Sequence, residues 1–261
     1  MGQTSGSESE NKANVLKYVN RYNSDNASYL SYLINLPKPS NFSWRKIYSI
    51  LSVFGQDVAN QNRYGPEFDE AISSLTEEEA ILVINIKYDI KWISLAMYSA
   101  ARHGYIRLLQ LCLESLDNIP PDQLNIISMK VWDGAIGNNN VDTIDYLISR
   151  GFYYVNDYNY YNRSQIEFNF SSAIQTGNPI IITKLLGYSK FDLDRYITAN
   201  SQNTRENLNA AEAVFRHIPM DLDSKTKSEI VWMLINDNRI FSKFNNFSIM
   251  NILNRLDLHI Q

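Results

Sequence analysis

Three segments of the chain align with one another without gaps, and this repetition limits the possible folds more than any other feature. The segments begin at Ala100, Ala135 and Ala173, so the spacing between them is 35 and then 38 residues. A repeat of this length is one supersecondary unit, which buries its apolar face only when copies stack on one another. The repetition therefore predicts a stacked helical array in the middle of the chain, over residues 93–187.

Within each segment, the first and fifth positions carry the strongest signal. The first residue is always alanine, which lets helices approach closely. The fifth residues are Gly104, Asn139 and Gly177, and Gly and Asn are the residues that tolerate a positive φ. Three positions before each alanine, one helical turn earlier, lies a large apolar residue. These residues are Met97, Trp132 and Phe170. The pattern predicts a helix that ends at the fifth position, followed by a second helix.

The second helix of each pair is expected to bury an apolar stripe. Its members are Leu108, Leu109 and Cys112 in the first segment, Ile144, Leu147 and Ile148 in the second, and Ile181, Ile182, Leu185 and Leu186 in the third. Cys112 is the single cysteine of the chain. Its position in this stripe favours a small buried apolar residue over a reactive thiol.

Each segment resembles the helix–turn–helix core of the ankyrin repeat, which reads Ala-Ala-x-x-Gly-His-x-x-Ile-Val-x-Leu-Leu-Leu-x-x-Gly. The resemblance implies an all-α fold, an ankyrin-like helical repeat solenoid with helical N- and C-terminal caps. The chain lacks the Thr-Pro-Leu-His start of that motif and its Asp-x-x-Gly hairpin signal. Short or irregular β-fingers are therefore expected between the pairs. A helical protein of another repeat family, or a set of unrelated hairpins, is the alternative.

The rest of the chain divides around this array. Residues 1–12 are polar and rich in Ser and Glu, and they are expected to form a disordered tail. Residues 13–92 have helical spacing and are expected to cap the array or to form a separate helical domain. Residues 188–261 are expected to hold a degenerate repeat and closing helices near 228–235 and 247–256, because terminal repeats must cover the apolar end of a stack.

Local signals place two helices in the N-terminal region. Thr76 and Glu79 form a capping box, so residues 80–86 are interpreted as a helix although their composition suits a strand. A second helix is predicted from apolar residues that share one face. They are Trp44, Ile47, Ile50, Leu51 and Phe54.

Composition excludes several classes of protein. Hydrophobic residues make up 44% and charged residues 20%, as in a folded globular chain. The net charge is −4 and the chain has no run of Lys or Arg, which disfavours nucleic-acid binding. No apolar run approaches the roughly 18 residues of a membrane span. Gly2 follows Met1 as in a myristoylation signal, but Gly6 stands where that signal requires Ser or Thr. We expect an intracellular, cytoplasmic protein that does not bind membranes.

No constellation of residues predicts catalysis, a metal or a cofactor. Nucleotide-binding glycine motifs and the nucleophile-elbow motif do not occur in the sequence. The histidines lack metal-site spacing, and His103 is expected to end a helix. They are His103, His217 and His259. Two close acidic pairs are interpreted as helix starts rather than metal ligands. They are Asp192 with Asp194, and Asp221 with Asp223.

A tyrosine-rich stretch, residues 152–161, is the strongest candidate for recognition. In an ankyrin stack the segment after the second helix lines the concave face. Tyrosine suits binding surfaces because its ring offers a large area with few rotors and a hydroxyl group. The candidate partner-binding residues are Tyr153, Tyr154, Tyr158, Tyr160 and Tyr161. The alternative is that this stretch is a long connection whose rings pack on the array.

Together these features predict a non-enzymatic protein–protein interaction module whose partner is another protein. Leu36 and Pro37, followed by Ile47, Ile50 and Leu51, faintly resemble the start of an F-box, so a substrate adaptor for a ubiquitin ligase is an alternative. A virion structural component is another, and an unrecognised enzyme is a third. The abundance of Asn, Ile, Tyr and Lys, with eroded repeats, resembles the ankyrin proteins of large DNA viruses of amoebae, or a protein of another AT-rich genome.

Overall fold

The computed structural model describes residues 6–54, 65–87, 90–116, 121–152, 170–188, 214–241 and 246–258. Every regular element in these ranges is helical, and no strand occurs in them, so the predicted all-α class is confirmed. The chain divides into two compact units, Met1–Ile119 and Pro120–Gln261. The first repeated segment lies in unit 1 and the other two lie in unit 2, and each unit is described by itself.

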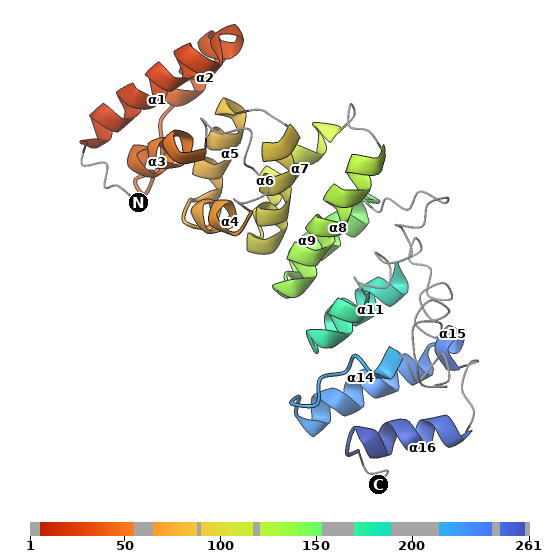
Figure 1. The fold of residues 1–261 in the computed structure, drawn as a ribbon. Helices are drawn as coiled ribbons and strands as arrows, with labels where there is room; N and C mark the ends of the chain where they lie inside the picture. The colour runs from red at the N-terminus through yellow and green to blue at the C-terminus, as the bar shows by residue number, and fades with distance from the viewer. Residues whose placement is uncertain are drawn as a thin grey trace. The chain divides into compact units, whose positions relative to one another are not determined.

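Unit 1 is a succession of short helices. They are α1 (Glu8–Tyr22), the 3-10 turn η1 (Ser24–Asn26), α2 (Ala27–Asn35), α3 (Trp44–Phe54), α4 (Gly65–Ser73), α5 (Glu77–Ile86), α6 (Ile90–His103) and α7 (Ile106–Leu113). Helix α1 packs on α2 and α3, and α5 packs on α2 and α3. Further along, α4 packs on α6 and α5 packs on α7, while α6 and α7 form a pair (Figure 1).

Helix α1 begins at Glu8, inside the segment that the sequence led us to expect as a disordered tail. The Ser7 hydroxyl caps this helix by accepting the backbone N–H of Glu10 at 3.2 Å. The Glu8 carboxylate accepts the backbone N–H of Trp44 at 2.7 Å, and Asn11 is buried. The helix is therefore held by contacts with residues more than thirty positions away, which local polarity does not reveal.

The capping box predicted at Thr76 and Glu79 is confirmed, and residues 80–86 are helical. The Thr76 hydroxyl accepts the Glu79 N–H at 3.3 Å, and the Glu79 carboxylate accepts the Thr76 N–H at 2.8 Å. The same carboxylate is fully buried and also accepts the backbone N–H of Ser43, directly before α3. Because Glu8 accepts the next N–H, at Trp44, two carboxylates from different helices stabilise the positive end of α3.

The core of unit 1 contains the face predicted for α3, since Trp44, Ile47, Ile50 and Leu51 are all buried. Three aromatic rings continue this core from α3 through α4 to α6. Phe54 meets Phe68 edge to face with centroids 5.6 Å apart, and Phe68 meets Trp92 in the same way at 5.1 Å. Such T-shaped pairs add about 0.5–1.5 kcal/mol beyond burial alone.

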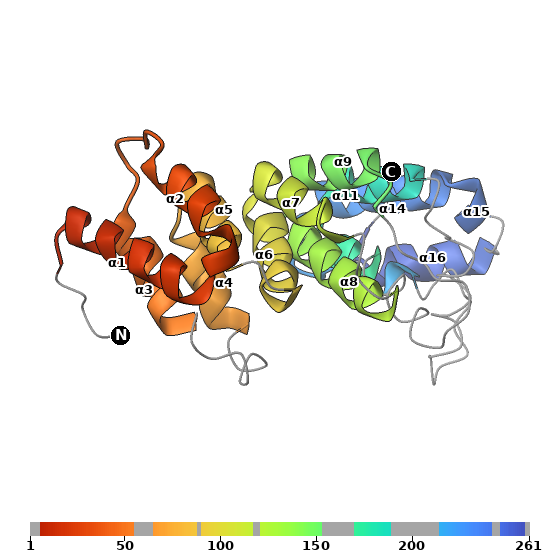
Figure 2. The same ribbon diagram turned by 90° about the horizontal axis from the view of Figure 1, so that it is seen from above.

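Unit 2 contains α8 (Pro121–Gly137), α9 (Val141–Ser149), α11 (Pro179–Gly187), α14 (Ser224–Asn236), α15 (Asn238–Phe241) and α16 (Asn246–Arg255). Residues 170–175 form the described end of another helix, directly before α11. Helix α8 packs on α9, α9 on α11, α11 on α14 and α14 on α15. Figure 2 shows α9, α11 and α14 following one another along one side of this unit. The closing helices predicted near 228–235 and 247–256 fall on α14 and α16.

Side-chain caps and ion pairs hold the helices of unit 2. Asp223 caps α14 by accepting the backbone N–H of Thr226 at 2.9 Å, as expected for an acidic pair at a helix start. Hydrogen bonds from Thr226 lower the pKa of the Asp223 carboxyl. Lys184 of α11 pairs with Asp145 of α9 at 2.6 Å. The cap stabilises α14 alone, whereas the Lys184–Asp145 pair joins two helices that also pack on each other.

None of the helices in the described ranges has both the length and the apolar character needed to cross a membrane. The longest of them, α8, has 17 residues.

Candidate binding surfaces

The fifth residue of each repeated segment adopts left-handed backbone. The φ angle is 76° at Gly104, 56° at Asn139 and 67° at Gly177. In each case this residue comes between two helices, as the residue types led us to expect. Gly177 also faces a close neighbour, because a Cβ built there would lie 2.7 Å from the side chain of Leu222. Glycine at this position therefore satisfies both the backbone angle and the packing.

Backbone hydrogen bonds close the first two turns in the same way. The N–H of Tyr105 donates to the carbonyl of Ala100 at 2.9 Å, and the N–H of Asn140 donates to the carbonyl of Ala135 at 2.9 Å. In each turn the donor is the residue that follows the left-handed residue, and the acceptor lies four residues before the left-handed residue. This hydrogen bond belongs to the Schellman motif. It satisfies a helix carbonyl that would otherwise lack a partner. The alanine thus takes part in the turn through its backbone as well as through its small size.

The repeated positions are also equivalent in burial. The three alanines, Ala100, Ala135 and Ala173, are fully buried, and so are the large residues one turn earlier, Met97, Trp132 and Phe170. In the second helices, most of the predicted stripe is buried. Ile148 and Leu186 are exceptions, because each is half-buried at the edge of its stripe. Prediction of a buried stripe is therefore correct for the centre of each helix and wrong for these two flanking positions.

Glu77 caps α7, which the sequence interpretation missed. One oxygen of its carboxylate accepts the N–H groups of Arg107 and Leu108, at 2.6 and 3.1 Å. The neighbouring Glu78 forms an exposed ion pair with Arg107 at 2.9 Å. Anionic groups stabilise the positive end of a helix. The sequence did contain a signal for this second cap, namely the run of three glutamates. A capping box uses only one of them, which leaves two carboxylates for other contacts.

A buried carboxylate, Asp69 of α4, holds the last turn of α6. Its two oxygens contact the guanidinium of Arg102 at 2.7 Å and the imidazole of His103 at 3.2 Å. His103 is the last residue of α6, which agrees with its interpretation as a helix-ending residue. The arrangement fastens α4 to α6, and both partners of Asp69 are basic groups that also suit the negative helix end.

The tyrosine-rich stretch lies almost wholly outside the described residues, and all five candidate tyrosines, Tyr153, Tyr154, Tyr158, Tyr160 and Tyr161, are among the residues that are not described. The residue that precedes them, Phe152, is buried. Its carbonyl accepts the indole N–H of Trp132 at 3.0 Å, and Trp132 is fully buried in α8. The stretch therefore starts from a fixed point in the core of unit 2.

Metal-ligating side chains are not clustered in the described ranges. No cluster of three or more His, Cys, Asp or Glu side chains that could hold a metal ion occurs in them. Cys112 is buried, and burial raises the pKa of its thiol to about 12, so it stays a neutral thiol. Besides the five tyrosines, four other residues considered from the sequence lie outside these ranges: Gly2, Asp192, Asp194 and His259.

His217 is a partly buried basic group in unit 2. Burial lowers the pKa of its imidazole, and the neighbouring charges of Arg216 and Arg255 lower it further. The Arg255 guanidinium donates to the carbonyl of Phe215, two residues before His217. This cluster of basic groups disfavours the protonated imidazole.

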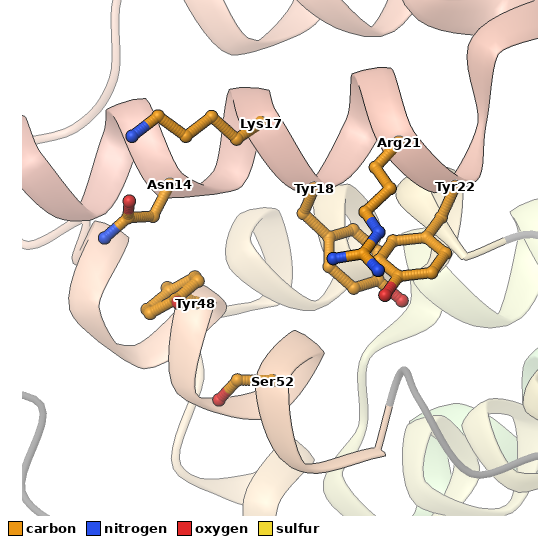
Figure 3. A pocket seen from close by; sticks show the side chains of 7 residues that line it. All are labelled: Asn14, Lys17, Tyr18, Arg21, Tyr22, Tyr48 and Ser52. Atoms are coloured by element: carbon orange, nitrogen blue, oxygen red, sulfur yellow. The ribbon is translucent and has the colours of Figure 1, made fainter.

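A pocket of about 170 Å³ opens between α1 and α3. Its lining consists of Asn14, Lys17, Tyr18, Arg21, Tyr22, Tyr48 and Ser52. Figure 3 shows Asn14, Tyr18, Arg21 and Tyr22 extending from α1 toward α3, which contributes Tyr48 and Ser52, while Lys17 runs along α1. We refer to this site as the α1–α3 pocket. The sequence does not reveal this pocket, because its two sides are about thirty residues apart in the chain.

Comparison with the models of known protein families, with curated proteins and with solved structures finds no match for this chain.

Proposed function

We propose that this chain is a non-enzymatic protein-binding module built from ankyrin-like helical pairs. The observation that carries the proposal is the equivalence of two turns, in which Tyr105 and Asn140 donate to Ala100 and Ala135 across a left-handed residue. The third turn has the same left-handed geometry at Gly177. Recurrence of one turn, with one pattern of burial, is what a repeat array requires.

The packing of helices within each unit supports a stacked arrangement. In unit 1, α4 packs on α6 and α5 packs on α7, so two consecutive pairs meet first helix to first helix and second helix to second helix. In unit 2, α9, α11 and α14 pack in succession. An array of this kind is extended and presents long surfaces, which repeat proteins use to bind other proteins. The N-terminal helices and α14 to α16 then serve as caps.

The tyrosine-rich stretch is the proposed contact site. It follows α9, where an ankyrin array places its binding fingers, and it leaves the core at Phe152, which the Trp132 indole holds. A fixed start limits the conformations that the stretch must lose on binding, and this favours affinity. The residues proposed to meet the partner are Tyr153, Tyr154, Tyr158, Tyr160 and Tyr161.

A ubiquitin-ligase adaptor and a virion structural component are the competing functions. Of the residues that resemble an F-box start, Ile47, Ile50 and Leu51 are buried in the core of unit 1. Their side chains are therefore engaged in packing and are not available on the surface of this chain. No observation on the described residues favours the virion component, which stays an alternative on composition alone.

Affinity purification tests the proposal. The full chain, tagged and expressed in its native cell, is cross-linked and purified, and each captured protein is then produced alone and titrated against the chain. We expect at least one purified protein to bind saturably and with fixed stoichiometry. Capture of the ubiquitin-ligase subunit that recognises F-boxes would favour the adaptor, and capture of capsid proteins would favour the virion component. Failure of every captured protein to bind directly would contradict the proposed function.

A further inference from the structure

The α1–α3 pocket has the lining of a site for an anionic group. Two of its seven lining residues, Lys17 and Arg21, are cationic, and none carries a carboxylate. The others are three tyrosines and two polar residues, which can donate hydrogen bonds to an anion. The pocket lies on α1 and α3, outside the repeated segments, so it stands independently of the proposed function.

Neither cation forms an ion pair within the described residues. Their side chains diverge, because Lys17 runs along α1 whereas Arg21 extends toward α3 (Figure 3). Lys17 and Arg21 are one turn apart on α1, where like charges weaken a helix. Residues 6–54 contain six Lys and Arg but three Asp and Glu, whereas the whole chain has 24 and 28. Positive charge is therefore concentrated here against the balance of the chain. A bound anion would offset this local excess of positive charge.

Aromatic rings hold one of these cations in place. The Arg21 guanidinium lies over the ring of Tyr22, 5.1 Å from its centroid. The Tyr22 ring in turn contacts the Tyr18 ring, with centroids 4.7 Å apart and planes inclined by 41°. Stacking fixes the plane of a guanidinium while its N–H edge can still face a carboxylate. Burial, with a contribution from Tyr22, raises the pKa of the Tyr18 phenol to about 12, so this ring stays neutral.

The size and the charge of the chain indicate the kind of ligand. A volume of about 170 Å³ is below the roughly 300–1,000 Å³ of pockets that enclose a whole small molecule, so it suits a single functional group. The whole chain has a net charge of −4, so an anionic bilayer, which faces a large part of its surface, repels it. A single acidic side chain, in contrast, contacts only the pocket and its positive charges. We propose that the α1–α3 pocket binds an acidic peptide by accepting one of its Glu or Asp side chains at Arg21, in the space that Lys17 and Tyr48 also line.

Fluorescence anisotropy tests this proposal on the full chain. The probes are labelled hexaglutamate, with hexaglutamine as the neutral comparison, and vesicles that contain phosphatidylserine. The site variant is Lys17→Gln with Arg21→Gln, and the matched control is Lys130→Gln with Lys225→Gln, two exposed lysines in unit 2. The Arg21→Lys variant keeps the charge but loses the planar stacking. Thermal melts verify that each variant is folded.

We expect saturable binding of hexaglutamate, weakened at least tenfold by the site variant, measurably weakened by Arg21→Lys, and unchanged in the control. Equal weakening in the site and control variants would overturn the proposal, because it would mean non-specific attraction. The absence of saturable binding, or no preference over hexaglutamine, would also overturn it. Binding to the vesicles with none to the peptide would assign the pocket to lipid headgroups instead.

Discussion

The backbone N–H of Asn140 donates to the carbonyl of Ala135 at 2.9 Å, across the left-handed residue Asn139. Tyr105 and Ala100 are joined in the same way at 2.9 Å, across Gly104. One local geometry therefore accounts for the Gly or Asn at the fifth position, while the full burial of Ala100 and Ala135 accounts for the small first residue. The turn, more than the apolar stripe, is what the first two segments share in detail.

Substitution at Asn139 tests the left-handed turn. Its φ of 56° is tolerated by Asn and is easiest for Gly. We expect Asn139→Gly to leave the free energy of unfolding unchanged or to raise it. Asn139→Val should lower it by about 1–2 kcal/mol, because a β-branched residue is strained in this region. Urea unfolding followed by circular dichroism measures both variants, and a neutral Asn139→Val would show that the turn is not left-handed.

Thr143 of α9 has a fully buried hydroxyl that lacks a hydrogen-bond partner in the described residues. The equivalent positions in the other segments are apolar and buried, at Leu108 and Ile181. We expect Thr143→Val to raise the free energy of unfolding by about 1 kcal/mol, because valine has nearly the same shape without the desolvated hydroxyl. Thr143→Ser, which keeps the hydroxyl and loses a methyl group, is the control and should be destabilising. Stabilisation by serine instead would contradict this explanation.

The cap that Glu77 provides for α7 predicts a difference between two adjacent glutamates. Glu77 accepts two backbone N–H groups, whereas Glu78 makes only an exposed ion pair with Arg107. We expect Glu77→Gln to lower the free energy of unfolding by about 0.5–1 kcal/mol. Glu78→Gln should change it by less than about 0.5 kcal/mol. Chemical unfolding of both variants makes the comparison, and equal effects would mean that the cap is not stabilising.

The lowered pKa of His217 predicts acid sensitivity. Because the folded-state pKa lies below the ordinary value of 6.5, the folded chain binds this proton less tightly than the unfolded chain does. Stability from this group is complete above that value and decreases as the pH falls below it. His217→Gln should therefore lose less unfolding free energy than the wild type between about pH 7.5 and about pH 5.5. An identical loss in the two proteins would assign the acid sensitivity to other groups.

Local chemistry explains which features of the fold were predictable. The left-handed residues at Gly104, Asn139 and Gly177, and the capping box of Thr76 and Glu79, depend on neighbours within five positions. Such signals are readable from one sequence, because the residue type itself carries the conformational preference.

Contacts between distant residues explain the features that were missed. The first turn of α1 depends on the bond between Glu8 and the N–H of Trp44, and the cap of α7 depends on Glu77. The α1–α3 pocket joins Tyr18 to Tyr48, which no periodicity connects. Ile148 and Leu186 were predicted to be buried but are half-buried, because the neighbouring helix determines how much of a helix edge is covered.

Tyr158→Ala combined with Tyr160→Ala tests the central claim, that the chain binds a partner through its tyrosine-rich stretch, most directly. The measurement pairs the melting temperature with the affinity for the partner identified by purification. Tyr29→Ala with Tyr32→Ala is the matched control, since both rings are exposed on α2. We predict that the stretch variant abolishes binding and leaves the melting temperature nearly unchanged, while the control binds normally. A loss of stability that accompanies the loss of binding would contradict the claim, and so would undiminished binding.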